Sequence, residues 1–149
     1  MKLVIASDHG AIELRQALVT YLQSQYTDID VVDLGIDTPE SVDYPDFADR
    51  VATQVLSGNA TMGILCCGTG IGIGIRANRY PGIRAALVYD AFTAEMAKAH
   101  NNANVLCLGG RTTDIEMAKQ FVSVWLDTAF EGGRHQRRLD KLDAPLVSL

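Results

Sequence analysis

A glycine-rich segment that follows two adjacent cysteines is the part of this sequence best suited to chemistry. The loop after Cys67 consists of Gly68, Thr69, Gly70, Ile71 and Gly72. Glycines allow positive φ and let backbone N–H groups converge on an anion, so the loop suits a phosphate or the oxyanion of an enediolate. A thiol beside such donors ionises readily, which makes Cys67 a candidate general base.

The same residues also have a purely structural interpretation. Free cysteine is commonly a small buried hydrophobic residue, and that description fits Cys66 and Cys107. Cys67 differs because it is expected at the end of a strand, where a side chain can turn into a crevice. The three cysteines lack the C-x-x-C spacing of zinc and redox sites, so we predict reduced thiols and no metal site. The glycines could likewise form only a tight turn against a helix.

Two further segments carry polar groups of the right kind. His100 stands before an amide-rich run that begins with Asn101 and could bind a polyhydroxylated ligand. A helix C-terminus also favours a cationic imidazole, which is the structural alternative for His100. Arg134 and Arg138 are four residues apart and would share one helical face, as two guanidinium groups must to hold one phosphate. A solvated helix face is the alternative.

The elements that must position these residues alternate between strands and helices. Short apolar runs predict strands, and apolar residues at helical spacing predict the helices between them. The strands are expected at 2–6, 31–34, 62–67, 84–89 and 105–108, and the helices at 12–22, 45–56, 91–99 and 113–129. This alternation predicts an α/β fold of three layers (αβα), with a five-stranded parallel sheet of unspecified strand order. We expect a single domain over 1–149, in which a segment as late as about 130–149 can extend beyond its own sheet as an arm.

The predicted sheet indicates where a ligand would bind. In open parallel sheets, ligands occupy the crevice beyond the carboxyl ends of the strands. Asp8 and His9 follow the first strand, the glycine loop follows the third, and Arg111 follows the last. We therefore expect these residues to lie close together.

Composition limits the classes of ligand. The net charge of −5 excludes broad affinity for nucleic acid or anionic membranes, because both require a basic surface. No run approaches the 18 or so apolar residues that span a bilayer, and no secretion leader is recognisable. We expect a cytoplasmic protein that binds a small anion at a locally built site.

A dinucleotide site is a second possibility, because Gly72-x-Gly74-x-x-Ala77 fits the G-x-G-x-x-A pattern and Asp90 could bind a ribose. The pattern should begin at the end of a strand, whereas the strand is expected to end at Cys67. A nucleotide-binding oxidoreductase and a non-catalytic sugar-phosphate binding module therefore both stay open. The binding module would not need a reactive thiol.

The motifs together resemble those of the type B ribose-5-phosphate isomerases, which are grouped with bacterial allose-6-phosphate and galactose-6-phosphate isomerases. Five motifs occur in order along nearly the whole chain. They are Ser-Asp-His-Gly at 7–10, Asp-Tyr-Pro at 43–45, Cys-Gly-Thr-Gly-Ile-Gly at 67–72, His-Asn-x-x-Asn at 100–104 and Gly-Gly-Arg-His-Gln at 132–136.

The resemblance implies an aldose-ketose isomerase of the pentose phosphate pathway with a Rossmann-like sheet and no cofactor or metal. It implies that Cys67 moves a proton between C2 and C1, with Thr69 beside it, and that His100 opens the furanose ring. It further implies a homodimer, or a dimer of dimers, whose active sites use residues from both subunits, with the arm at about 130–149 contacting the partner subunit. The residues implied to bind the sugar hydroxyls are Asp8 and Asn101, and those around the phosphate are His9, Arg111, Arg134 and Arg138, with the last two from the partner.

The resemblance also bears on the substrate. Some members have serine at the position of Cys67 and use a glutamate a few residues later as base, whereas this chain has the cysteine and lacks that acid. Galactose-6-phosphate isomerase subunits often lack the cysteine motif. Ribose 5-phosphate is therefore the predicted substrate, and allose 6-phosphate is the alternative.

Overall fold

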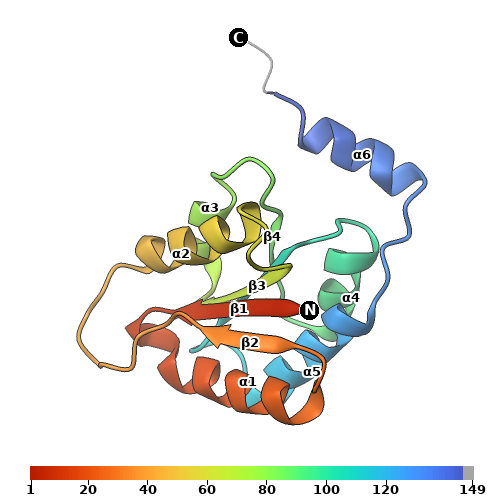
Figure 1. The fold of residues 1–149 in the computed structure, drawn as a ribbon. Helices are drawn as coiled ribbons and strands as arrows, with labels where there is room; N and C mark the ends of the chain where they lie inside the picture. The colour runs from red at the N-terminus through yellow and green to blue at the C-terminus, as the bar shows by residue number, and fades with distance from the viewer. Residues whose placement is uncertain (146–149) are drawn as a thin grey trace.

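A five-stranded parallel sheet forms the centre of the molecule in the computed structural model, which describes residues 1–145 (Figure 1). The strands lie in the order β2-β1-β3-β5-β4. Their bounds are β1 Lys2–Ser7, β2 Asp30–Asp33, β3 Met62–Cys67, β4 Ala85–Leu87 and β5 Val105–Gly109. The predicted fold class and the five strands are confirmed. The alternation of elements in the sequence did not specify the order of the strands, which the structure provides.

Helices cover both faces of the sheet. Helices α1 (Ile12–Gln25), α4 (Ala91–Ala99) and α5 (Ile115–Asp127) pack on one face, and α2 (Tyr44–Leu56) and α3 (Ile71–Ala77) pack on the other. A short 3₁₀ turn, His9–Ala11, joins β1 to α1. Helix α6 (Arg134–Leu142) extends away from the layers as an arm (Figure 1). The last four residues of the arm predicted at 130–149 lie outside the described residues.

Local sequence explains where the main helices begin. Asp114 caps α5, because its side chain accepts hydrogen bonds from the backbone N–H groups of its first turn. Asp90 caps α4 by accepting from the Thr93 backbone N–H at 2.6 Å, and that hydrogen bond lowers the pKa of the Asp90 carboxyl. Asp90, which the dinucleotide interpretation assigned to ribose binding, is therefore the N-terminal cap of α4.

Strand β4 is shorter than the strand predicted at 84–89. It covers Ala85–Leu87 at the edge of the sheet. The chain leaves the strand early because the backbone N–H groups of Tyr89 and Asp90 both donate to the Thr93 hydroxyl, each at 3.3 Å. The cap of α4 thus competes with strand pairing and ends the strand.

The side chains of the central strand β3 point alternately into two hydrophobic cores, one on each face of the sheet. Ile64 and Cys66 of β3 face α1, α4 and α5, whereas Leu65 and Cys67 face α2 and α3. All six residues of β3 are buried. Adjacent cysteines in one strand therefore have different surroundings, because successive side chains point to opposite faces.

A switch point in the strand order creates the crevice. The chain passes from β1 to β2 on one side and then to β3 on the other side, and the loops after β1 and β3 lead to helices on opposite faces of the sheet. The two loops are in close contact, because a Cβ added at Gly10 would lie 3.2 Å from the Gly68 nitrogen. Asp8 and the glycine loop after Cys67 thus share one edge of the sheet.

A buried arginine fixes this edge. Arg15 is fully buried, and its Nη1 donates to the Ser7 hydroxyl at 3.1 Å and to the Ile36 carbonyl at 2.6 Å. Its guanidinium also pairs with Asp33 at 3.1 Å and with Asp37. Arg15 therefore ties the end of β1, directly before Asp8, to the loop that leaves β2.

We expect Arg15→Met to lower the free energy of unfolding by about 2–3 kcal/mol, because charged hydrogen bonds are lost from a buried position. The midpoint of urea unfolding measures the change. Arg137→Met, at an exposed position on α6, is the matched control and should leave the midpoint nearly unchanged. Equal midpoints for the two variants would contradict the role of Arg15.

Candidate active site

Cys67 occupies the carboxyl end of the central strand β3, with 4% of its surface exposed. The backbone N–H of Gly70 points at its sulfur at 3.2 Å. An N–H directed at a sulfur stabilises negative charge on it. This geometry requires glycine at 70, because φ is 76° and a Cβ would lie 2.7 Å from Cδ1 of Leu87 and 2.9 Å from the Leu108 backbone.

The other two thiols have no such donor in the described structure. Cys66 and Cys107 are both fully buried. Burial raises the pKa of the Cys66 thiol far above its ordinary value and raises the pKa of Cys107 to about 12, with nearby Cys67 adding to both effects. These two thiols stay protonated at neutral pH, so the structure distinguishes Cys67 from its neighbours.

The glycine loop passes directly into a helix. The Thr69 side chain accepts a hydrogen bond from the Ile71 backbone N–H at 3.3 Å, and α3 begins at Ile71. Gly72 and Gly74 therefore lie inside α3 rather than in a turn between strand and helix. The G-x-G-x-x-A pattern is thus misplaced for a dinucleotide site, and Gly74 instead allows close packing against the Cys107 sulfur.

Three residues from the neighbouring loops complete this edge. Asp8 is buried and accepts from the Gly10 N–H at 2.9 Å. His9 accepts from the Val42 N–H through Nδ1 at 3.2 Å, which leaves Nε2 for a ligand. The Arg111 backbone N–H donates to the Gly68 carbonyl at 2.9 Å, and the Arg111 guanidinium lies beside Gly68. We name this group the carboxyl-edge cluster: Asp8, His9, Cys67, Gly68, Thr69, Gly70, Ile71, Gly72 and Arg111.

Tyr44 belongs beside this cluster, although the sequence analysis assigned it no role. Its ring lies against Gly72, where a Cβ would come within 2.6 Å of the ring and 2.9 Å of the hydroxyl. The residue is 40% exposed. The Asp-Tyr-Pro motif contains this tyrosine. Its proline is also typical of a helix start, and that explanation of the motif assigns no role to the tyrosine.

His100 lies at the opposite edge of the sheet. It ends α4, which runs antiparallel to the strands, and β5 begins only at Val105. The Gly63 N–H donates to the Asn104 carbonyl, so this segment lies beside the start of β3. Four residues of strand, roughly 13 Å, separate that point from Cys67. The structure therefore does not bring His100 and Cys67 together within one protomer.

The two arginines of the arm accompany His100. Arg134 and Arg138 are exposed on α6. The arm meets the body through His135, whose ring stacks on that of His100 with 4.1 Å between centroids and 12° between planes. Asn101 follows His100 directly and is exposed. We name this second group the amino-edge cluster: His100, Asn101, Arg134 and Arg138.

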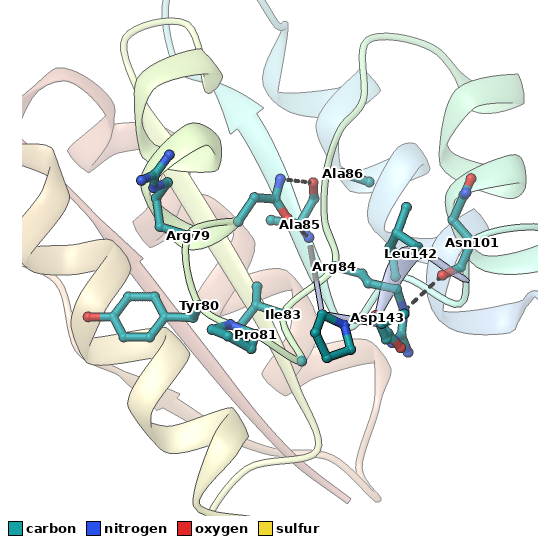
Figure 2. A pocket seen from close by; sticks show the side chains of 15 residues that line it. Arg79, Tyr80, Pro81, Ile83, Arg84, Ala85, Ala86, Asn101, Leu142 and Asp143 are labelled. Carbon is teal, nitrogen blue, oxygen red and sulfur yellow. Dashed lines mark hydrogen bonds and ion pairs between the residues drawn. The ribbon is translucent and has the colours of Figure 1, made fainter. Parts of the chain in front are cut away.

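A hollow of about 870 Å³ lies beside the amino-edge cluster (Figure 2). It is bounded by the 78–86 segment, by Asn101 and by the end of α6. Arg84 crosses it, donating to the Asp143 carboxylate at 2.9 Å and to the Asn101 carbonyl at 3.1 Å. These contacts attach the far end of the arm to the body.

One group of metal-ligating types occurs among residues 1–145: His100, Glu131 and His135, with ligand atoms within 4.8 Å of one another. The two imidazole planes are nearly parallel. Their nitrogen lone pairs therefore lie in separate parallel planes and do not converge on one point. The ligands of a metal ion must direct their lone pairs at the same point. The arrangement suits a stacked pair better than chelation.

None of the helices described for residues 1–145 has the length and hydropathy of a membrane-spanning segment.

Comparison with known proteins gives a consistent result over nearly the whole chain. Residues 3–142 match the family model described as Ribose/Galactose Isomerase. The chain is 39% identical to ribose-5-phosphate isomerase B of Escherichia coli over 143 residues, which cover 96% of this chain and 95% of that protein.

Solved structures agree with the sequence comparison. A ribose 5-phosphate isomerase from Thermotoga maritima is 50% identical, with a TM-score of 0.91 and coverage of 95% of this chain and 97% of that one. The Mycoplasma genitalium ribose-5-phosphate isomerase B, solved with bound ribulose 5-phosphate, is 42% identical. Its TM-score is 0.89, with coverage of 95% and 93% of the two chains.

We expect iodoacetamide to modify Cys67 in the folded protein at least about tenfold faster than Cys66 or Cys107, because only Cys67 combines an N–H donor with a position at the crevice. Peptide mass spectrometry after a short exposure at neutral pH measures the three rates. Cys67→Ser should remove the fast reaction. Faster labelling of Cys66 or Cys107 would contradict the assignment.

Proposed function

The chain belongs to the Ribose/Galactose Isomerase family, among its type B ribose-5-phosphate isomerases, and on that premise we propose that it interconverts ribose 5-phosphate and ribulose 5-phosphate with Cys67 as base. The family establishes that the protein is an isomerase. The observation that carries the proposal is the Gly70 N–H aimed at a single thiol beside the crevice. Cys66 and Cys107, with raised pKa values, do not compete for this task.

The reaction begins with the ring of the cyclic sugar. The C1 hydroxyl loses a proton, the bond from C1 to the ring oxygen breaks, and that oxygen gains a proton. His100 is the proposed group that donates to the ring oxygen or accepts the hydroxyl proton, because a histidine side chain can act as acid or as base. Asn101 and Asp8 hold the hydroxyl groups of the open chain.

The open aldose then loses the proton on C2 to the Cys67 sulfur. An enediolate forms, with negative charge on the oxygen at C1. The proton of the C2 hydroxyl passes to the oxygen at C1, and the thiol returns the abstracted proton to C1, which leaves a carbonyl at C2 and gives the ketose. Backbone N–H groups of the glycine loop stabilise the oxyanion, and the Thr69 hydroxyl lies beside it. His9, Arg111, Arg134 and Arg138 hold the phosphate, so that remote binding positions the carbon chain against the sulfur.

This scheme needs two copies of the chain, because its two catalytic groups lie at opposite edges of one sheet. In a twofold dimer whose axis is perpendicular to the strands, the partner's strands run in the reverse direction. The amino-edge cluster of one copy then meets the carboxyl-edge cluster of the other. We propose a homodimer, or a dimer of dimers, in which the arm of the partner subunit brings Arg134 and Arg138 to the phosphate.

An exposed apolar surface supports this dimer. It covers α3, the edge strand β4 and the start of α4, beside the glycine loop. Its side chains are between 40% and 68% exposed: Ile71, Ile75, Leu87, Tyr89 and Phe92. Apolar groups gathered in this way are typical of protein interfaces. The edge strand at its centre has an unpaired side, which a second copy can cover.

The five-carbon substrate has one specific point in its favour. The Mycoplasma genitalium relative was solved with bound ribulose 5-phosphate, and 42% of aligned residues are identical. Allose 6-phosphate is the second candidate, because the motifs of the chain also resemble those of allose-6-phosphate isomerases. A coupled assay with both aldose phosphates at equal concentration distinguishes the two.

We expect Cys67→Ala to lower kcat for ribose 5-phosphate by about 10²–10⁴-fold, because the proton acceptor is lost. In deuterium oxide the unmodified enzyme should incorporate solvent deuterium at the transferred position, and the variant should not. Coupled absorbance and mass spectrometry measure the two effects. Cys66→Ala is the matched control, because it removes the neighbouring thiol from the opposite face of the strand. Full activity of Cys67→Ala would refute Cys67 as base.

A further inference from the structure

We propose that His135 is a positioning residue for His100. Its stacked ring, with the carboxylate of Glu131, holds the His100 imidazole in the orientation that ring opening requires. The inference rests on the proposed function, in which His100 opens the sugar ring. It goes beyond that function because it gives a residue of the arm a task other than binding phosphate.

The burial of His135 is the first support. Only 4% of its surface is exposed, although the residues on either side of it, Arg134 and Gln136, are exposed. Its ring covers one face of His100 at a centroid distance of 4.1 Å. The His100 side chain is otherwise 35% exposed and ends a helix. The buried His135 ring, packed against one face of the His100 ring, therefore restricts the rotation of the His100 side chain.

Glu131 provides the second restraint. Its Oε2 lies 3.2 Å from Nε2 of His135 and 3.9 Å from Nε2 of His100. Its backbone N–H donates to the Ala99 carbonyl at 3.0 Å, so the carboxylate is tied to the residue directly before His100. A carboxylate fixed beside an imidazole orients the ring and selects which nitrogen carries the proton.

Charge in the cluster is arranged so that one ring is neutral. Burial lowers the pKa of His135, and His100, Arg134 and Arg138 lower it further, against the opposing effect of Glu131. His135 thus stacks on His100 as a neutral ring.

The arm is also fixed along α6 beyond this contact. Leu139, one helical turn after His135, is 4% exposed, and Asp143 pairs with Arg84. His135 therefore cannot leave His100 without loss of the contacts along α6. The arm holds Arg134 and His100 in a fixed relation before the two copies meet, which reduces the ordering required at the shared site.

The test compares two aldoses that differ in ring formation. Ribose 5-phosphate is largely cyclic, whereas 4-deoxyribose 5-phosphate lacks the hydroxyl that closes a furanose and remains open. A residue that positions His100 for ring opening affects the first substrate only. A residue that merely stabilises the fold or binds the phosphate affects both.

We expect His135→Ala to lower kcat for ribose 5-phosphate by about 10- to 100-fold, because a small displacement of the reacting group has a large effect on rate. For the 4-deoxy substrate, kcat should stay within about twofold. His135→Phe keeps a stacked ring and should restore most of the rate. Gln136→Ala, on the exposed side of the same helix, is the matched control and should behave as the unmodified enzyme.

Equal losses for the two aldoses would overturn the inference, as would an unchanged kcat for ribose 5-phosphate. A rise in KM alone would assign His135 to phosphate binding instead. If His135→Phe were as slow as His135→Ala, stacking would not be the cause. Absence of ribose 5-phosphate turnover by the unmodified enzyme would refute the proposed function itself, which separates the two failures.

Discussion

The common direction of the five strands is the constraint on which the rest of the structure depends. It places Cys67 at the carboxyl edge of the sheet and His100, which ends an antiparallel helix, at the amino edge. Each edge holds only part of the chemistry that an aldose-ketose isomerase needs. The carboxyl edge has the thiol, the glycine loop and Arg111, and the amino edge has the imidazole and the arm. A reversed second copy is the simplest way to unite them.

Local contacts order each edge within a single chain. At the carboxyl edge, Arg15 fixes the end of β1 and the left-handed Gly70 aims its N–H at the Cys67 sulfur. At the amino edge, the stack of His135 on His100 and the pair of Arg84 with Asp143 hold the arm to the body. Both groups are therefore ordered within a single chain. Binding energy from the substrate phosphate can then serve to position the sugar.

Much of this arrangement could be predicted from the sequence, because periodicity and strand-end motifs are local signals. They gave the fold class, the strands and the grouping of Asp8, His9 and the glycine loop at one edge. The separation of His100 from Cys67 arises because α4 runs antiparallel to the strands, so its last residues lie at the amino edge of the sheet. The order of motifs along the sequence does not predict this separation. The stack of His135 and the contact of Tyr44 with Gly72 arise from tertiary packing. Strand β4 is shorter than predicted because the helix cap formed by Asp90 and Thr93 competes with strand pairing.

The central claim, that each active site takes Cys67 from one copy and His100 from the other, is tested most directly by mixing two inactive variants. Cys67→Ala and His100→Asn chains are unfolded together and refolded in equal amounts. A mixed dimer then has one site with both groups intact, so about a quarter of the unmodified activity should return if half of the dimers are mixed. Each variant refolded alone should stay inactive. A mixture that remains as inactive as its components would contradict the account.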